Sequence, residues 1–464
     1  MTDDESRSIK DENIKEENKK TNDSIKKEKE NKEEMKEKDK GKKEEMSKKI
    51  KSITEKEIKI NVEPLYNFLK NRWVFIALII IFSLSFYIRI FGFNYNYLRN
   101  IDSYWHYRYM KMIVDNNGKL PEYDILMEAP EYRKIDTMHF YHYLGAYSYM
   151  LFKIFFPDVE LWRFLVYFPA FLASLAVIPC YFIGKRLYDK KAGIFLSFLL
   201  VFNSAIISRS LGGDPDSDAI VLLLPLIILA FFFESIHEIK ENKIKKGILY
   251  SILTGFFLAI LAYTWVTWHV FYFISGVVAI EFILELLHNN RKFAKYFVIS
   301  YIACIAIFFI LTIPIIGIEF IGIILGGPFE ALKLKAEEGD FPNVYVSVAE
   351  MMEGGNVKNV GRNLGVYLAD GDSVISKGLG TIYTLLYFCA IIFSILYISI
   401  IYMKKRKYLE ALLFLLLWGG GFLFASIYAI RFSIFLALPL SLALSIFLSK
   451  IWRVILKEDK GLVD

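Results

Sequence analysis

Cysteine is scarce in this sequence. The 464 residues contain three cysteines, and Cys180, Cys304 and Cys389 all lie within hydrophobic segments. No disulfide framework and no CxxC metal site can be built from cysteines placed in this way. A cleavable signal peptide is also not visible, because about sixty hydrophilic residues precede the first hydrophobic segment. We therefore expect that first segment to act as an uncleaved membrane anchor.

The first sixty residues contain no aromatic side chain and are dominated by Lys, Glu, Asn and Asp. Such a segment cannot bury enough apolar area to offset the entropy that is lost when its chain is ordered. We predict that residues 1–60 form a disordered, charged cytoplasmic tail, with helical structure near residues 46–60. Residues 61–464 are then expected to form one multi-span transmembrane domain.

Long hydrophobic runs are what the sequence has in abundance. Hydrophobic residues make up 55% of the chain, and segments such as 73–91, 221–233 and 434–448 approach or reach the length that crosses a bilayer. These features predict an all-α polytopic membrane protein of about ten or more helices. Spans are placed at 73–91, 163–184, 192–208, 218–236, 247–264, 266–287, 296–314, 378–402, 408–426 and 430–449.

The charge of the connecting loops predicts the topology. Lysines and arginines cluster at 185–191, 240–246, 291–295 and 404–407, and positively charged loops remain in the cytoplasm. This placement explains the formal net charge of +6 better than a nucleic-acid partner does. With ten spans, both termini are cytoplasmic, in a multi-pass protein of the cell membrane.

Two long loops, 92–162 and 327–377, are then expected outside the cell. Residues 141–156 of the first loop form an apolar patch, which we interpret as a helix in the outer membrane interface. The Ile- and Gly-rich segment 315–326 either extends the preceding span or forms a short re-entrant piece.

Acidic side chains recur on the predicted outer side. Asp102 follows the first span, Asp214, Asp216 and Asp218 lie between the third and fourth spans, and Glu350 lies in the second long loop. A carboxylate at the edge of the hydrocarbon region is costly unless a cation or another partner stabilises it. Carboxylates from separate loops supply the hard oxygen ligands that Mg²⁺ or Mn²⁺ prefers. The alternative is that residues 214–218 only cap the next helix.

Other polar residues near the membrane have two interpretations each. Arg431 opens the last span on the outer side, where a guanidinium suits a phosphate, or it is an interfacial arginine whose head group reaches water. His139 and His142 are either metal ligands or polar anchors in the interface. We expect anchors, and we expect His269 in an aromatic belt beside Trp265.

Taken together, these motifs resemble those of the catalytic subunit of oligosaccharyltransferase, and most closely its archaeal members. The first acidic motif of that family follows the first span, as residues 100–108 do here, although Asn100 stands where the family usually has a second acid. The second acidic motif follows an Arg-Ser/Thr-x-x-Gly stretch. It is matched by residues 209–213 and by Asp216-Ser217-Asp218.

The later part of the chain carries further family landmarks. Residues 347–350 match a Ser/Thr-x-x-Glu motif of the long external loop, and Arg431-Phe432 matches an Arg-Phe pair that opens a late span. Tyr263-Thr264-Trp265 also resembles a family sequence. The resemblance covers roughly residues 70–450, with four motifs in the family's order.

The resemblance implies a GT-C-type glycosyltransferase transmembrane domain and a reaction. An oligosaccharide would pass from a dolichyl-phosphate-type lipid to asparagine of an acceptor polypeptide, with inversion at the anomeric carbon. It also implies a catalytic Mn²⁺ or Mg²⁺ site formed by Asp102, Asp216 and Glu350, with Asp218 supporting these ligands from behind. Arg431 would bind the lipid phosphate.

The family also has a C-terminal domain, in which a Trp-Trp-Asp motif reads the acceptor sequon. That tripeptide does not occur in this sequence, so the resemblance is to the transmembrane portion. A separate chain that carries the C-terminal domain is therefore a candidate partner, beside the lipid-linked oligosaccharide and the acceptor polypeptide.

Other functions remain open from the sequence. The chain is alternatively a half-enzyme or a non-catalytic subunit of the glycosylation machinery, or another GT-C glycosyltransferase that uses lipid-phosphate sugars. A transporter would need charged residues near the membrane midplane and broken helices in repeated halves. Neither feature is present, because the acids cluster at one predicted face.

Overall fold

The computed structural model describes residues 35, 38, 40–48, 63–128, 130–135, 138–333 and 374–456. Its contacts divide the chain into two units, Met1–Arg72 and Trp73–Asp464. Residues 40–48 of the first unit are helical, whereas residues 49–62, which include most of the helix predicted at 46–60, lie outside the described residues. Glu350 and most of the second external loop also lie outside them.

Eight helical segments of the described part are long and apolar enough to cross a membrane. The first, Arg72–Ile90, belongs to α2 (Glu63–Ile90), and the second, Leu161–Leu187, joins α5 (Leu161–Leu175) to α6 (Val177–Leu187). Five of the other six are single helices: α9 (Asp218–Lys240), α10 (Ile244–Ala262), α11 (Trp268–Leu287), α12 (Arg291–Ile316) and α19 (Ser433–Ile455). The sixth segment, Leu409–Ile427, runs through α17 (Leu409–Leu413), η3 (Phe414–Trp418) and α18 (Gly419–Tyr428). The prediction of a polytopic α-helical membrane protein is therefore confirmed.

The helix predicted over residues 192–208 is instead two helices. α7 (Lys190–Val201) has 12 residues, which corresponds to about 18 Å at 1.5 Å per residue and is shorter than a bilayer core. The side chain of Asn203 then accepts a hydrogen bond from the backbone N–H of Ala205 at 3.0 Å. This cap starts the short helix α8 (Ser204–Ile207) and interrupts the span.

Two further segments of the prediction have a clear outcome. Residues 378–402 lie within α16 (Val374–Lys405), a continuous helix of 32 residues. The ambiguous segment 315–326 does not extend the preceding span, because α12 ends at Ile316 and Gly317 has a φ of +107°. A separate helix, α13 (Phe320–Lys333), follows.

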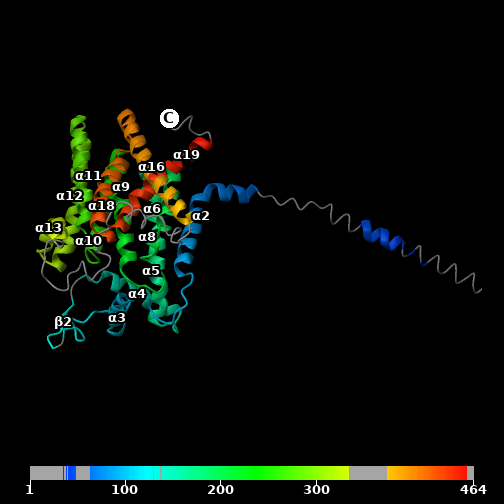
Figure 1. Ribbon diagram of the computed structural model, residues 1–464, viewed down its shortest axis with the longest axis horizontal. Helices are drawn as coiled ribbons and strands as arrows, with labels where there is room; N and C mark the ends of the chain where they lie inside the picture. The colour runs from blue at the N-terminus through cyan, green and yellow to red at the C-terminus, as the bar shows by residue number, and fades with distance from the viewer. Residues whose placement is uncertain are drawn as a thin grey trace, which may run out of the picture. The chain divides into compact units, whose positions relative to one another are not determined.

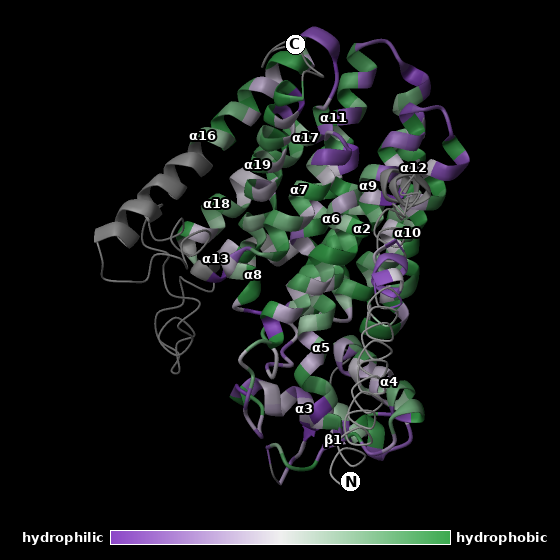
Figure 2. Cartoon of the chain, turned by 90° about the vertical axis from the view of Figure 1, so that its right-hand side faces the viewer, coloured by the Kyte–Doolittle hydropathy of each residue, from purple (hydrophilic) through white to green (hydrophobic). Residues whose placement is uncertain are grey.

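The first predicted external loop is largely folded. It contains α3 (Ile101–Asp115), a two-stranded antiparallel sheet of β1 (Tyr123–Asp124) and β2 (Arg133–Lys134), and α4 (Phe140–Phe155). The helix predicted over the apolar patch is thus confirmed as α4. Within the second unit, α3, α4 and the sheet gather at one end of the bundle, and α19 ends toward the other (Figure 1). Hydrophobic residues dominate the middle of the helices and hydrophilic ones the two ends (Figure 2).

α9 is the central helix of the second unit. In the membrane-spanning part of α9, 89% of the residues are buried, compared with 17% for α2 and 22% for α12. Close backbone approach lets neighbouring helices pack around it. A Cβ on Gly255 of α10 would lie 2.2 Å from the carbonyl oxygen of Cys304 in α12, so only glycine permits this crossing. Neighbouring helices therefore enclose α9 along most of its length.

Candidate active site

The loop between α8 and α9 is anchored from inside the bundle by a buried arginine. Arg89 of α2 is 1% exposed. Its Nε donates to Oγ of Ser210 at 2.9 Å, its Nη1 to Oγ of Ser85 at 2.6 Å, and its Nη2 to the carbonyl of Val201 at 2.7 Å. None of the described carboxylates forms an ion pair with this guanidinium. Arg89 thus joins α2, α7 and the acidic loop through neutral acceptors.

The two glycines of this loop let it lie against α2 and α5. The backbone N–H of Gly212 donates to the carbonyl of Arg89 at 2.8 Å, and that of Gly213 to the carbonyl of Val166 at 2.9 Å. Gly213 has a φ of +81°, and a Cβ there would lie 2.0 Å from the ring of Phe93. The Arg-Ser-Leu-Gly-Gly sequence therefore has a packing role, since it fixes the backbone from which the three aspartates project.

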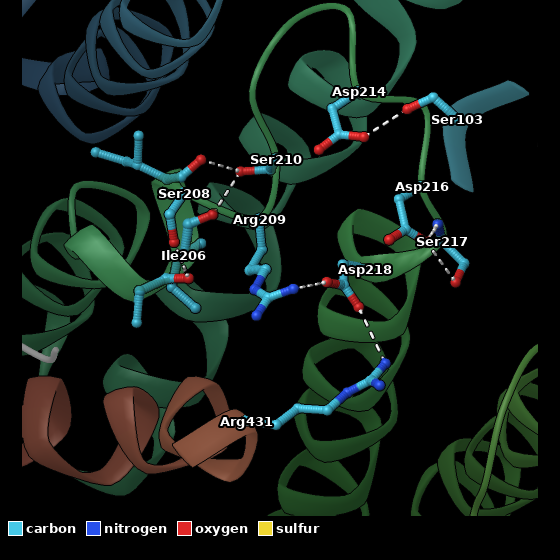
Figure 3. Close-up of polar contacts among 12 residues, drawn as sticks. Ser103, Ile206, Ser208, Arg209, Ser210, Asp214, Asp216, Ser217, Asp218 and Arg431 are labelled. Carbon is cyan, nitrogen blue, oxygen red and sulfur yellow. Dashed lines mark hydrogen bonds and ion pairs between the residues drawn. The ribbon is translucent and has the colours of Figure 1, made fainter. Parts of the chain in front are cut away.

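Each aspartate of the loop has a different partner. Asp214 accepts a hydrogen bond of 2.6 Å from Oγ of Ser103, and Oδ1 of Asp216 lies 3.0 Å from Nε2 of His106. Asp218, the first residue of α9, is approached by two arginines, as Figure 3 shows. The side chain of Ser217, which precedes α9, makes no capping hydrogen bond. The sequence 214–218 is therefore more than a helix cap.

The arginine pair at Asp218 brings distant parts of the chain together. Nη1 of Arg209 lies 3.5 Å from Oδ2 of Asp218, and Nη2 of Arg431 lies 3.8 Å from Oδ1. Arg431 also lies over the ring of Trp265, 5.9 Å from its centroid. These four residues line a small pocket together with Val221, Leu222, Ile434 and Phe435. A cationic pocket of this kind can accept an anionic group.

The first acidic motif meets the second through α3. Ser103 and His106 are three residues apart and lie on the buried face of α3 with Met110 and Ile113. This face places the two side chains against Asp214 and Asp216. Asp102 lies beside Ser103 at the start of α3 and is exposed. The structure therefore brings the segment that contains Asp102 next to the loop that contains Asp216.

The histidines of this region are not interfacial anchors. His139 and His142 are only 5% and 2% exposed, and they form a hydrogen-bonded chain with His106. The expectation of anchors was wrong because the helix containing residue 142 packs against α3 and turns this face inward. His106 was also missed, although its position within the first acidic motif was a signal for it.

The two half-buried acids of the loop, Asp214 and Asp216, differ in the direction in which their surroundings shift the pKa. Burial raises the pKa of Asp214, and its hydrogen bond from Ser103 only partly opposes this effect. Burial also acts to raise the pKa of Asp216, but hydrogen bonds from His106 and Ser217 outweigh it and lower the pKa. Asp216 is thus held as the ionised carboxylate of the pair.

Two of the three predicted metal ligands lie in the described part of the chain. Asp102 and Asp216 belong to adjoining segments, whereas Glu350 lies outside the described residues. Across the described ranges, no group of three or more His, Cys, Asp and Glu side chains is arranged to hold a metal ion. The three-ligand site of Asp102, Asp216 and Glu350 therefore remains a prediction.

The described residues define a class of protein: an α-helical, multi-pass membrane protein with an acidic, arginine-flanked site at one end of its bundle. Residues 73–460 match the family model described as oligosaccharyl transferase STT3, N-terminal. The chain belongs to this family, of which it carries the N-terminal region.

Similar curated proteins are archaeal glycosyltransferases. The chain is 27% identical over 272 residues to dolichyl-phosphooligosaccharide-protein glycotransferase 1 of Pyrococcus furiosus, a match that covers 57% of this chain and 27% of that protein. It is 21% identical over 211 residues to dolichyl-phosphooligosaccharide-protein glycotransferase of Methanococcus voltae, covering 43% of this chain and 23% of the relative. The matched region is thus about a quarter of the length of these relatives.

Solved structures show the same fold. The chain superimposes on the archaeal oligosaccharyltransferase AglB from Archaeoglobus fulgidus, in complex with an inhibitory peptide and a dolichol-phosphate, with a TM-score of 0.56 and 17% identity over 85% of this chain and 52% of that chain. A complex of the A. fulgidus enzyme with Zn and sulfate gives a TM-score of 0.58 at 18% identity, covering 82% of this chain and 49% of that chain. The GT-C-type fold is therefore confirmed, over about half of each solved chain.

Proposed function

We propose that this chain transfers an oligosaccharide from a dolichyl-phosphate-type lipid to the side-chain amide of asparagine in acceptor proteins. Family membership supports the reaction class. The observation that carries the proposal is the fixed position of Asp216 and Asp218 at the head of α9, with Arg431 beside them. This transfer needs carboxylates that bind the asparagine amide and a guanidinium that binds the lipid phosphate, and it needs them next to each other.

The donor set fits a hard divalent cation, which we propose to be Mn²⁺ or Mg²⁺. Oδ1 of Asp216 is engaged by His106 and Ser217, and no described residue donates a hydrogen bond to Oδ2. Asp102 is exposed beside this loop, and Glu350 would complete the set. These are oxygen ligands, which suit Mg²⁺ and Mn²⁺ rather than a softer metal. When bound, such an ion would neutralise negative charge that develops on the leaving phosphate.

The residues of the chain have distinct roles in the proposed reaction. The amide nitrogen of asparagine is a weak nucleophile, because its lone pair is delocalised into the carbonyl group. Asp216 would accept a hydrogen bond from the amide N–H and orient the nitrogen toward the anomeric carbon. That nitrogen then forms the new C–N bond to the anomeric carbon while the bond from this carbon to the phosphate oxygen breaks on the opposite side, which inverts the carbon. The amide gives up one N–H proton to the carboxylate of Asp216, and the lipid phosphate leaves with the electron pair of the broken bond.

Arg431 would stabilise the departing phosphate, and Asp218 would hold Arg431 and Arg209 in place before the lipid binds. A guanidinium presents several N–H donors in one plane and can bind two phosphate oxygens together. Trp265 forms the apolar wall of the same pocket. This wall reduces the access of water, which strengthens the attraction between the arginine and the phosphate.

We place the site on the extracytoplasmic side and both termini in the cytoplasm. α9 runs from Asp218 in the site to Lys240 at its other end, and its 23 residues rise about 34 Å, enough to cross the bilayer core. Lys240 lies 2.9 Å from Glu281 and 2.6 Å from Glu410, so the basic loops meet at the end opposite the acidic site. Positive loops remain inside, which supports this orientation.

The test is transfer in proteoliposomes that contain the chain, a dolichyl-phosphate-linked oligosaccharide and a sequon peptide. A second arm adds a chain that carries the Trp-Trp-Asp domain, because the relatives are longer. We expect glycosylated peptide in at least the second arm, with loss of more than about 100-fold in Asp216→Asn, the range seen when one essential charge-stabilising group is removed. Asp158→Asn, an exposed acid on the turn after α4, is the matched control.

Three outcomes would contradict the proposal. They are the absence of transfer in both arms, equal activity of Asp216→Asn and Asp158→Asn, and transfer of sugar to a hydroxyl acceptor while asparagine stays unmodified. The last outcome would instead identify another GT-C glycosyltransferase that uses lipid-phosphate sugars.

A further inference from the structure

Three buried histidines form a chain that ends on the carboxylate of Asp216. Nδ1 of His139 lies 2.9 Å from Nδ1 of His142, Nε2 of His142 lies 2.9 Å from Nδ1 of His106, and Nε2 of His106 lies 3.0 Å from Oδ1 of Asp216. His106 is 7% exposed, and the other two rings are more deeply buried. No ring nitrogen takes part in two of these contacts, so the three contacts follow one another in a line and do not converge on one point.

Aromatic side chains enclose the three rings. The ring of Trp105 lies 5.0 Å from that of His142, the ring of Tyr109 stacks on His139 at 5.0 Å, and Tyr141 meets His106 edge-on at 5.3 Å. These walls prevent the histidine rings from rotating freely. A polar nitrogen in such surroundings costs free energy unless it has a hydrogen-bond partner. The neighbouring histidines and Asp216 are those partners. The matching of donors to acceptors therefore sets which nitrogen donates in each hydrogen bond.

The carboxylate determines which nitrogen of each histidine carries hydrogen. An ionised carboxylate only accepts hydrogen bonds, whereas a neutral imidazole has one donor and one acceptor nitrogen. Nε2 of His106 must therefore donate to Asp216, which leaves its Nδ1 to accept from Nε2–H of His142. Nδ1 of His142 must in turn accept from Nδ1–H of His139. For neutral rings, one set of tautomers satisfies all three contacts.

We infer that His106, oriented by His142 and His139, is a positioning residue that fixes the carboxylate of Asp216 for glycosyl transfer. This inference rests on the proposed function and deepens its account of Asp216. The terminal torsion of an aspartate is broad and roughly two-fold, so the loop alone does not orient the oxygens. With Oδ1 held by His106, Oδ2 is directed to the acceptor amide or a bound cation, as partners behind a metal ligand commonly do.

If the three histidines had only a structural role, the expected results would be different. Three buried histidines between α3 and α4 would then stabilise the packing of these helices and nothing more. Any substitution that keeps the fold would leave Asp216 unaffected, and either nitrogen of His106 would serve equally well. The position of the donor atom on residue 106 therefore separates the two explanations.

The first measurement needs no substitution of the site. The sequence has six histidines, so ¹⁵N-histidine labelling of the intact chain gives a spectrum in which each ring can be assigned. The ¹⁵N shifts report the tautomer of each imidazole. We expect hydrogen on Nε2 of His106 and His142 and on Nδ1 of His139. The reverse set, with Nδ1 protonated on His106 and His142, would overturn the inference.

The second measurement moves the donor atom. Glutamine places its amide nitrogen near the position of Nε2, and asparagine places it near that of Nδ1. The dissociation constant of Mn²⁺, measured by electron paramagnetic resonance on the purified chain, should be nearly native in His106→Gln and about 10–100-fold weaker in His106→Asn, the usual effect of losing a partner behind a metal ligand. His288→Asn, an exposed histidine at the end of α11, is the control.

The outcomes separate this inference from the proposed function. Equal Mn²⁺ affinity and equal turnover of folded His106→Gln and His106→Asn would refute the positioning role, even if wild-type chain transfers sugar. Expected tautomers and unequal Mn²⁺ affinities, together with no transfer in any arm, would support the positioning role and refute the proposed reaction. If both variants fail to fold, the tautomers of the wild-type chain decide the question.

Discussion

The guanidinium of Arg89, buried in the first membrane span, donates a hydrogen bond to the hydroxyl of Ser210 at 2.9 Å. The two residues are 121 positions apart, and Ser210 lies in the loop that carries the three aspartates. The contact places the anchor of the acidic loop inside the bundle. Stability and site geometry are therefore coupled through one side chain.

Loss of this anchor should destabilise the chain. Ser210→Ala removes one hydrogen bond to a buried charge, and we expect a loss of about 1.5–3 kcal/mol in the free energy of unfolding. Arg89→Lys should cost more, because one ammonium cannot reach acceptors on α2, α7 and the loop together. Thermal unfolding in detergent measures both. Arg163→Lys, with a side chain that is 65% exposed, should unfold at the wild-type temperature.

Gly213→Ala should damage the site by two effects that a matched glycine separates. Gly92 and Gly213 have nearly the same positive φ, +80° and +81°, but only Gly213 lies against a ring. Gly92→Ala should therefore lower the free energy of unfolding only by the cost of a side chain at positive φ, about 1–2 kcal/mol. Gly213→Ala should lower it clearly more. If Phe93→Ala does not partly restore the thermal stability of Gly213→Ala, the ring contact is not the cause.

Substitution of Arg431 should separate phosphate binding from simple placement at the interface. Arg431→Lys keeps the charge but loses the planar set of donors, so kcat/KM for the lipid-linked sugar should fall, and Arg431→Ala should cost on the order of 2–5 kcal/mol. Arg453 is a close control, because it pairs with Asp189 at 3.6 Å near the far end of α19, the helix that begins two residues after Arg431. Full activity of Arg431→Lys would mean that the residue is an interfacial anchor.

Accessibility labelling should establish the orientation of the chain. In a background without the three native cysteines, single cysteines at Lys190, Lys245 and Lys405 should react with an impermeant reagent only from the cytoplasmic side. A cysteine at Asp158, on the turn after α4, should react only from outside. Outer labelling of any two of the lysine positions would contradict the proposed topology.

The sequence was sufficient for the membrane class, because the energetic cost of placing polar groups in a bilayer makes a hydrophobic span visible in one dimension. Eight of the ten predicted spans correspond to the eight membrane-length segments of the described residues, with shifts of a few residues at their ends. Residues 192–208 failed because a hydropathy window does not detect the local cap at Asn203, where a side chain competes for a backbone N–H. The acidic loop and Arg431 were also recognisable, since charged residues beside an apolar run are rare without a function.

The sequence by itself thus determined which residues belong to the membrane, which carry charge at its edge and to which family their order corresponds. Only the tertiary structure decided which partner each acid has: Ser103 for Asp214, His106 for Asp216, and two arginines for Asp218. It also placed the histidines inside and the Arg89 anchor beneath the loop. Hydropathy depends on composition along the chain, whereas a hydrogen bond depends on distances between atoms that folding brings together from remote positions.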